Sequence, residues 1–144
     1  MHQKSIAEHA NSLAKGEYSS VELTEHFLKR IESNSDLNAF ITVTDQLARE
    51  QATQADQLIK AGKAGLLTGI PIAQKDLLCA KGVLTTCGSR ILENFISPYD
   101  ATVITKLHEQ GMVTLGKTNM DEFAMGSSNE TSFYGPVKNP WDLE

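Results

Sequence analysis

Two serine capping boxes near the start of the chain constrain its fold most strongly. Ser5 and Ser19 are each followed three residues later by a glutamate. At this spacing the serine hydroxyl and the glutamate carboxylate satisfy free amides of the first helical turn. Apolar residues then recur at intervals of three and four, so that Ile6, Ala10, Leu13 and Ala14 should lie on one face of the first helix. A third run of this kind follows Asp45, a suitable N-cap. The pattern predicts amphipathic helices over residues 5–15, 20–34 and 45–61.

Short runs of β-branched, aromatic and other apolar residues alternate with these helical patterns. Residues 39–43 and 112–115 are typical of strands. A third run, residues 69–74, contains Pro71, which indicates a strand start or a sheet edge because proline cannot donate a ladder hydrogen bond. Between the last two runs, Asp100 is expected to cap a further helix. The alternation predicts an α/β fold, with helices leading into a mixed β-sheet that is flanked by helices.

The composition restricts the function classes. Eighteen acidic and thirteen basic residues give a net charge of -5, the wrong sign for a surface that must neutralise many phosphates. No apolar run is long enough to cross a bilayer, and the first residues lack the features of a secretory or transit peptide. We therefore expect a cytoplasmic protein with no membrane association, in which Cys79 and Cys87 stay reduced.

Lys75, at the end of the third apolar run, is the first candidate for chemistry. A lysine acts as a general base only after it has lost its proton, and burial favours the neutral amine. We therefore expect Lys75 to be largely buried, with Asp76 on the opposite face of the strand and pointing away from it. The alternative is an exposed lysine beside Asp76, which is common after strands.

Residues 116–142 form the second candidate region, an ordered loop rich in Gly, Ser, Thr, Asn and Pro. Its hydroxyls include Ser127 and Ser128, but no histidine lies near them in sequence, so a Ser-His-Asp triad is poorly supported. Asp121 and Glu122 are adjacent and would diverge on a regular element. We expect no metal site here.

Three blocks of this sequence resemble those of the amidase-signature family: GIPIAQKD, TTCGSRIL and GKTNMDEFAMGSSNETSFYGPVKNPWD. The likeness covers essentially the whole chain. Within the family, the block from Met120 to Gly126 is most similar to that of the tRNA-dependent glutamine amidotransferases. The resemblance implies that residues 1–144 are the N-terminal portion of a single amidase-signature domain and end before its Gly/Ser-rich catalytic region.

The resemblance also implies roles for individual residues. Enzymes of the family use a Ser-Ser-Lys triad, in which a lysine takes a proton, through a middle serine, from a nucleophilic serine that attacks an amide carbonyl. Lys75 matches the lysine. Both serines belong to the Gly/Ser-rich region, so Ser127 and Ser128 receive no acyl-enzyme role. Met125 and Gly126 match positions whose backbone faces the substrate amide, and core packing is the alternative for Met125.

For a whole enzyme of this kind, the resemblance implies that glutamine is hydrolysed and that its ammonia passes to the B and C partner subunits, where ATP-activated Glu-tRNA(Gln) becomes Gln-tRNA(Gln). ATP and Mg²⁺ are then used by the whole complex, and this segment binds no cofactor. Two alternatives stay open, a stand-alone amidase of the same family and a non-catalytic fragment. We expect the chain alone to be inactive, because a lysine base without its nucleophile cannot form an acyl-enzyme.

Overall fold

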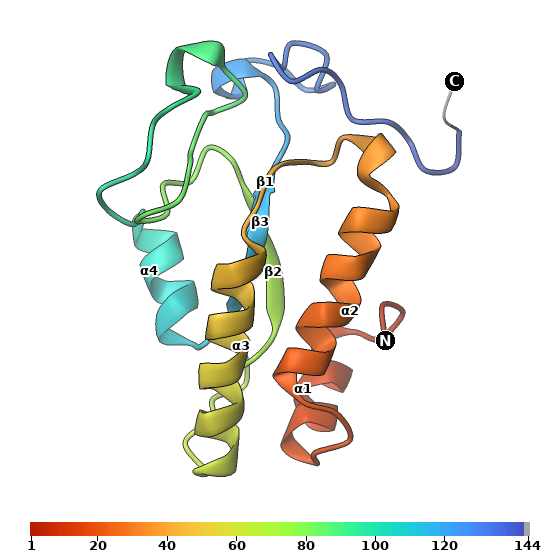
Figure 1. Cartoon of the computed structure of the whole chain (residues 1–144), viewed down its shortest axis with the longest axis vertical. Coiled ribbons are helices and arrows are strands. Elements are labelled where there is room, and N and C mark those ends of the chain that lie inside the picture. Colours follow the sequence, from red (N-terminus) through yellow and green to blue (C-terminus); the bar gives the residue numbers. More distant parts are fainter. Residues whose placement is uncertain (143–144) are drawn as a thin grey trace.

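The computed structural model describes residues 1–142, which contain four α-helices and a three-stranded mixed sheet (Figure 1). The predicted α/β class is confirmed, and helix exceeds strand as expected. The helices are α1 (Ile6–Ala14), α2 (Ser20–Ser33), α3 (Asp45–Lys60) and α4 (Thr102–Glu109). The strands are β1 (Phe40–Val43), β2 (Pro71–Lys75) and β3 (Val113–Thr118). Within these residues, no helix combines the length and the apolar character needed to cross a bilayer.

The serine capping boxes start α1 and α2 as predicted. The hydroxyls of Ser5 and Ser19 each accept a hydrogen bond from the amide of the glutamate three residues later, and each glutamate carboxylate accepts from the serine amide. In α1, Leu13 is buried but Ile6 is 56% exposed, so the apolar face predicted from the sequence is covered only in part. From His9 onward α1 faces the core, with His9, Ser12 and Leu13 buried.

Two acidic residues that the sequence favoured as N-caps have other roles. The residue before α3 is Thr44, and Asp45 is the first helical residue, where a negative charge still favours the helix N-terminus. The N-cap of α4 is Ala101, because the side chain of Asp100 is engaged elsewhere. Its Oδ1 accepts the amide of Lys81 at 2.6 Å and so fixes the long connection after β2.

Helices α2 and α3 cover one part of the sheet. Leu28 of α2 and the alanines Ala48 and Ala52 of α3 form a buried cluster with Val113 and Leu115 of β3. The small alanine side chains let α3 approach the strand closely. A second cluster joins Leu13 of α1 and Leu23 of α2 to Ile70 and Met112, the residues just before β2 and β3. A third joins α4 to the segment after β2. Burial of this apolar surface stabilises the arrangement.

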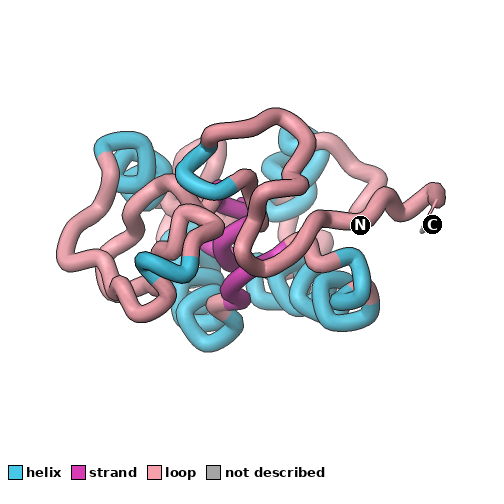
Figure 2. Tube along the Cα trace, turned by 90° about the horizontal axis from the view of Figure 1, so that it is seen from above, coloured by secondary structure: helices cyan, strands magenta, loops and turns pink. Residues whose placement is uncertain are grey.

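The sheet order brings the ends of two strands together. β3 is central, with β1 antiparallel on one side and β2 parallel on the other. Among the residues described, β2 is therefore an edge strand, and Pro71 is its first residue, which agrees with the predicted strand start or sheet edge. β3 runs beyond the predicted strand to Thr118, which lies opposite Lys75. Because β2 and β3 run in the same direction, their following loops emerge at the same end of the sheet, and Figure 2 shows these loops surrounding the strands from above.

Candidate functional site

A shallow pocket of about 500 Å³ lies at this end of the sheet. One wall is the end of β2, with Lys75, and the other walls come from the residues that follow β3. The pocket thus brings together Lys75 and Gly126, two of the three site residues predicted from the sequence. Its lining residues are Ala73, Lys75, Thr118, Asn119, Met120, Asp121, Ala124, Gly126, Ser127, Ser128 and Asn129.

The third predicted residue, Met125, does not line this pocket and is 80% exposed. Core packing, the alternative considered for Met125, is therefore excluded within residues 1–142. Ser127 and Ser128 do line the pocket, and the hydroxyl of Ser128 donates to the carboxylate of Glu130 at 2.7 Å. In the described part of the chain, histidine, cysteine, aspartate and glutamate side chains form no group of three or more that could hold a metal ion.

Lys75 is exposed, so the prediction that it is largely buried is wrong. The reason is the alternation of side chains along β2. Ala73 and Lys75 are exposed on one face, whereas Gln74 and Asp76 are buried on the other, at 2% and 0% exposure. The part of the prediction that placed Asp76 away from Lys75 is confirmed. Within residues 1–142, no side-chain partner neutralises the Lys75 ammonium.

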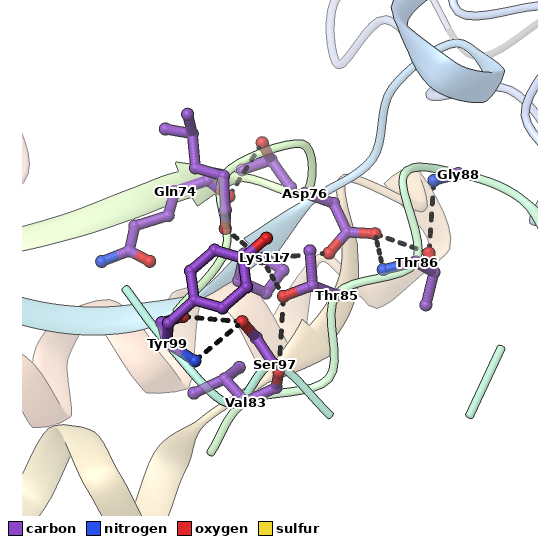
Figure 3. A network of polar contacts seen from close by, with 11 residues as sticks. Gln74, Asp76, Val83, Thr85, Thr86, Gly88, Ser97, Tyr99 and Lys117 are labelled. Atoms are coloured by element: carbon purple, nitrogen blue, oxygen red, sulfur yellow. Dashed lines mark hydrogen bonds and ion pairs between the residues drawn. The ribbon is translucent and has the colours of Figure 1, made fainter. Parts of the chain in front are cut away.

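A second lysine, Lys117 of β3, occupies the buried position that the sequence suggested for Lys75. It is fully buried, and its Nζ lies 3.3 Å from Oδ1 of Asp76. The ammonium also donates to the carbonyl of Leu78 at 2.8 Å and to the hydroxyl of Thr85 at 3.0 Å (Figure 3). Burial lowers the pKa of Lys117 from its ordinary value, and the negative charge of Asp76 acts in the opposite direction.

Sequence reasoning missed Lys117, although one signal indicated that Asp76 needs a buried cation or several hydrogen-bond donors. The alternation that turns Asp76 away from Lys75 also turns its carboxylate into the protein, and a buried carboxylate requires a cation or several hydrogen-bond donors. In the sequence Lys117, like Lys75, comes after an apolar run. Only the pairing of β2 with β3, which sets Gln74 opposite Lys117, shows that Lys117 faces Asp76.

The loop that carries Gly126 is organised around Asp121. The carboxylate of Asp121 accepts the amide of Asn129 at 2.9 Å, and the amide and hydroxyl of Thr131 at 3.2 and 2.9 Å. These hydrogen bonds to the charged form lower the pKa of Asp121 from its ordinary value. A β-carbon at Gly126 would lie 2.5 Å from the carboxyl carbon of Asp121, so a larger residue there would displace the carboxylate from its position in the loop.

This loop also holds an unusual backbone conformation. Phe123 and Ala124 have positive φ angles of 50° and 60°, in the left-handed region that side chains with a β-carbon rarely adopt. Strained backbone of this kind persists only where surrounding contacts over-determine it, and such residues cluster at functional sites.

A larger groove, of about 930 Å³, lies between α2 and the sheet. Its lining includes the apolar side chains of Phe27, Ile31, Phe40 and Leu115, and it contains neither Lys75 nor any residue of the 121–131 loop. The titratable and backbone groups expected for amide chemistry therefore gather in the smaller pocket.

Comparison with known proteins identifies close relatives. The family model described as Amidase matches residues 22–144. The A subunit of the glutamyl-tRNA(Gln) amidotransferase of Thioalkalivibrio sulfidiphilus is 64% identical over 143 residues, which are 99% of this chain and 30% of that protein. The same subunit of Alkalilimnicola ehrlichii is 61% identical over all of this chain and 30% of its own length. The chain thus spans about 30% of the length of these curated relatives.

Solved structures agree with this relationship. The native peptide amidase of Stenotrophomonas maltophilia superposes with a TM-score of 0.88 at 31% identity, over 97% of this chain and 30% of that one. A bacterial aryl acylamidase of the amidase-signature family superposes with a TM-score of 0.90 at 29% identity, again over 97% of this chain and 30% of the other. By its sequence and its fold, the chain belongs to the amidase-signature family.

Proposed function

We propose that this chain is the N-terminal part of the glutamine-hydrolysing subunit of a glutamyl-tRNA(Gln) amidotransferase, with Lys75 as its general base. One observation carries the proposal: Lys75 and Gly126, which match the family's base and a substrate-facing position, line the same pocket although 51 positions separate them in the sequence. The chain's relatives are named as the A subunit of this amidotransferase, and its family is that of the amidases.

In the proposed reaction the neutral amine of Lys75 accepts a proton from a middle serine. That serine takes its proton from the nucleophilic serine, whose oxygen attacks the side-chain carbonyl of glutamine. The same proton then passes to the departing amide nitrogen, so that ammonia leaves and an acyl-enzyme remains. Gly126 and the neighbouring backbone of Met125 lie along the substrate amide. In residues 1–142 the Lys75 side chain is exposed, which leaves room for a hydroxyl from the rest of the enzyme to reach the amine. The segment that carries this hydroxyl would then also supply the burial that favours the neutral form of lysine.

The remaining steps are assigned to other parts of the complex. Ammonia passes to the B and C subunits, where Glu-tRNA(Gln) is activated with ATP and Mg²⁺ and converted to Gln-tRNA(Gln) in the cytoplasm. The net charge of -5 supports this division, because an acidic chain contributes little to holding a polyanionic tRNA. No serine within this chain is assigned as the nucleophile, so the chain alone should be inactive.

A chimera tests the proposal. Residues 1–144 replace the matching segment of the T. sulfidiphilus A subunit, and the product is assembled with its partner subunits. The wild-type chimera should release ammonia from glutamine, while the isolated chain should release none. Lys75→Ala should reduce kcat by about 10²–10⁴-fold. The matched control is Lys60→Ala, at the exposed end of α3, which should leave turnover unchanged. Normal turnover by Lys75→Ala would refute the proposed base.

A stand-alone amidase acting on a small amide is the second candidate, favoured by the superposition on the peptide amidase and the aryl acylamidase. The same chimera distinguishes the two functions. A preference for glutamine that appears only with the partner subunits supports the amidotransferase. Equal turnover of short aliphatic or aryl amides without those subunits supports the stand-alone amidase.

A further inference from the structure

We propose that residues 85–89 form a brace that positions the two walls of the pocket relative to each other, and that Thr86 and Gly88 are its positioning residues. This segment belongs to the TTCGSRIL block, to which the proposed reaction gives no role. The inference rests on the proposed function of the pocket, and it adds residues that would act on catalysis without touching substrate.

The first attachment of the brace is to the end of β2. Asp76, the residue after Lys75, accepts the amide of Thr86 at 2.9 Å and its hydroxyl at 2.5 Å, both through Oδ2. The amide of Cys87 donates to the backbone carbonyl of Asp76 at 3.3 Å. Asp76 and Thr86 are both 0% exposed, and Figure 3 shows Asp76 between Thr86 and Lys117. The backbone next to Lys75 is thereby tied to the brace at three points.

The second attachment is to the loop that carries Gly126. The amide of Phe123 donates to the carbonyl of Cys87 at 2.8 Å, and the amide of Phe133 donates to the carbonyl of Gly88 at 2.8 Å. The hydroxyl of Ser89 donates to the carboxylate of Glu122 at 2.5 Å. The bonds of Phe123 and Ser89 hold the start of the strained turn. The bond of Phe133 holds the chain at the end of the loop.

Gly88 is the point of closest contact between the brace and this loop. Its φ is +67°, and a β-carbon there would lie 2.6 Å from the carbonyl oxygen of Met120, a backbone atom with little freedom to move. The hydroxyl of Thr86 accepts the amide of Gly88 at 3.2 Å and so connects the two attachments. A change at Thr86 or Gly88 should therefore alter the position of Lys75 relative to Gly126.

Two glycines provide a matched test of the contact by hydrogen exchange. Gly82 has a φ of +77° and nothing within 4 Å of the place that a β-carbon would occupy, so Gly82→Ala and Gly88→Ala both place alanine in the left-handed region. Only Gly88→Ala also pushes against the loop. In the 144-residue chain, exchange of the Phe123 and Phe133 amides should accelerate at least about tenfold in Gly88→Ala and stay unchanged in Gly82→Ala. Equal exchange in the two variants would overturn the brace.

The chimeric enzyme tests the effect on catalysis. Thr86→Val removes the hydroxyl that links the two attachments, whereas Thr86→Ser keeps it. Thr86→Val should lower kcat for glutamine about 10–100-fold, the loss expected from a displacement of about 1 Å, and Thr86→Ser should stay within about threefold of wild type. If Thr86→Val fails to fold, Ser89→Ala decides. It should lower kcat about threefold or more, and an unchanged kcat would overturn the proposal.

The two proposals fail in different ways. If Lys75→Ala keeps normal turnover, Lys75 is not the base in the proposed function, and the exchange of the Phe123 and Phe133 amides still tests the brace. If Lys75→Ala abolishes turnover while Thr86→Val and Thr86→Ser have the same kcat, the brace does not position the site. A melting temperature that falls in both Thr86 variants with no difference in kcat would assign Thr86 a purely structural role and also overturn the proposal.

Discussion

Replacing Lys117 by methionine should destabilise the chain far more than the same replacement at Lys75. Methionine keeps most of the apolar volume of lysine but removes the ammonium. The carbonyl of Leu78 and the hydroxyl of Thr85 then lose the ammonium as a donor. The Asp76 carboxylate loses its counter-charge, stays fully buried and, within residues 1–142, keeps only the hydrogen bonds from Thr86. Removing one member of a buried ion pair costs about 3–5 kcal/mol. For a chain of this size the melting temperature should fall by about 10–20 °C.

Urea unfolding of the 144-residue chain measures this difference directly. Lys75→Met, on the exposed face of the neighbouring strand, is the matched control and should change the free energy of unfolding by less than about 0.5 kcal/mol. Adding Asp76→Asn to Lys117→Met removes the unpaired charge but keeps the acceptor for Thr86. The double variant should therefore lose about 1–3 kcal/mol less unfolding free energy than the two single variants lose together. Equal costs for the two methionine variants, or strict additivity, would refute the reasoning.

Three further outcomes are expected. In the chimeric enzyme, Lys75→Arg should lose nearly as much kcat as Lys75→Ala, because a guanidinium stays protonated and cannot accept the serine proton; near-normal turnover would make Lys75 a structural cation. Because the pKa of Asp121 is lowered in the folded state, its stabilising effect is present above the ordinary value of 3.8 and is lost as the pH falls through the lowered pKa. Urea midpoints measured from about pH 6 to about pH 2.5 should therefore drop less steeply in Asp121→Asn than in wild type, and parallel profiles would contradict this. Ile104→Ala should cost about 2–5 kcal/mol of unfolding free energy, because Ile104 is fully buried. Val103→Ala, at a position 44% exposed, should cost less than about 1 kcal/mol. Similar costs for the two variants would show that the α4 cluster is not part of the core.

The elements of the fold were largely predictable because their signals are local. A capping box is complete within four residues, so Ser5 and Ser19 identified the starts of α1 and α2. Through its missing amide, Pro71 indicated a strand start or a sheet edge, and it is the first residue of β2, which lies at an edge of the sheet formed by residues 1–142. The wrong caps, Asp45 and Asp100, show the limit of this reasoning. An aspartate near a helix start can bond a distant group instead, as Asp100 does with the amide of Lys81, and the sequence does not say which partner is nearer.

The candidate site was predictable only in part, for a similar reason. The motifs pointed to Lys75 and Gly126, and the structure places both on one pocket. Lys75 was expected to be buried because it follows an apolar run. Burial, however, depends on which face of the strand other segments cover, and the covered face holds Asp76. The contacts that tie the 85–89 segment to the pocket walls were not visible in the sequence, because they join residues that are far apart along the chain.

By itself, the sequence determined the helix starts, the α/β class, the family and the residue types available for chemistry, because each of these depends on neighbours along the chain or on a recognisable block of residues. Only the tertiary structure decided that Lys117, and not Lys75, neutralises Asp76. It alone decided that TTCGSRIL lies between the strand end and the Gly126 loop. Both outcomes depend on the parallel pairing of β2 with β3, which places the loops that follow the two strands at one end of the sheet. Which side chains become buried there is decided only when these segments pack together.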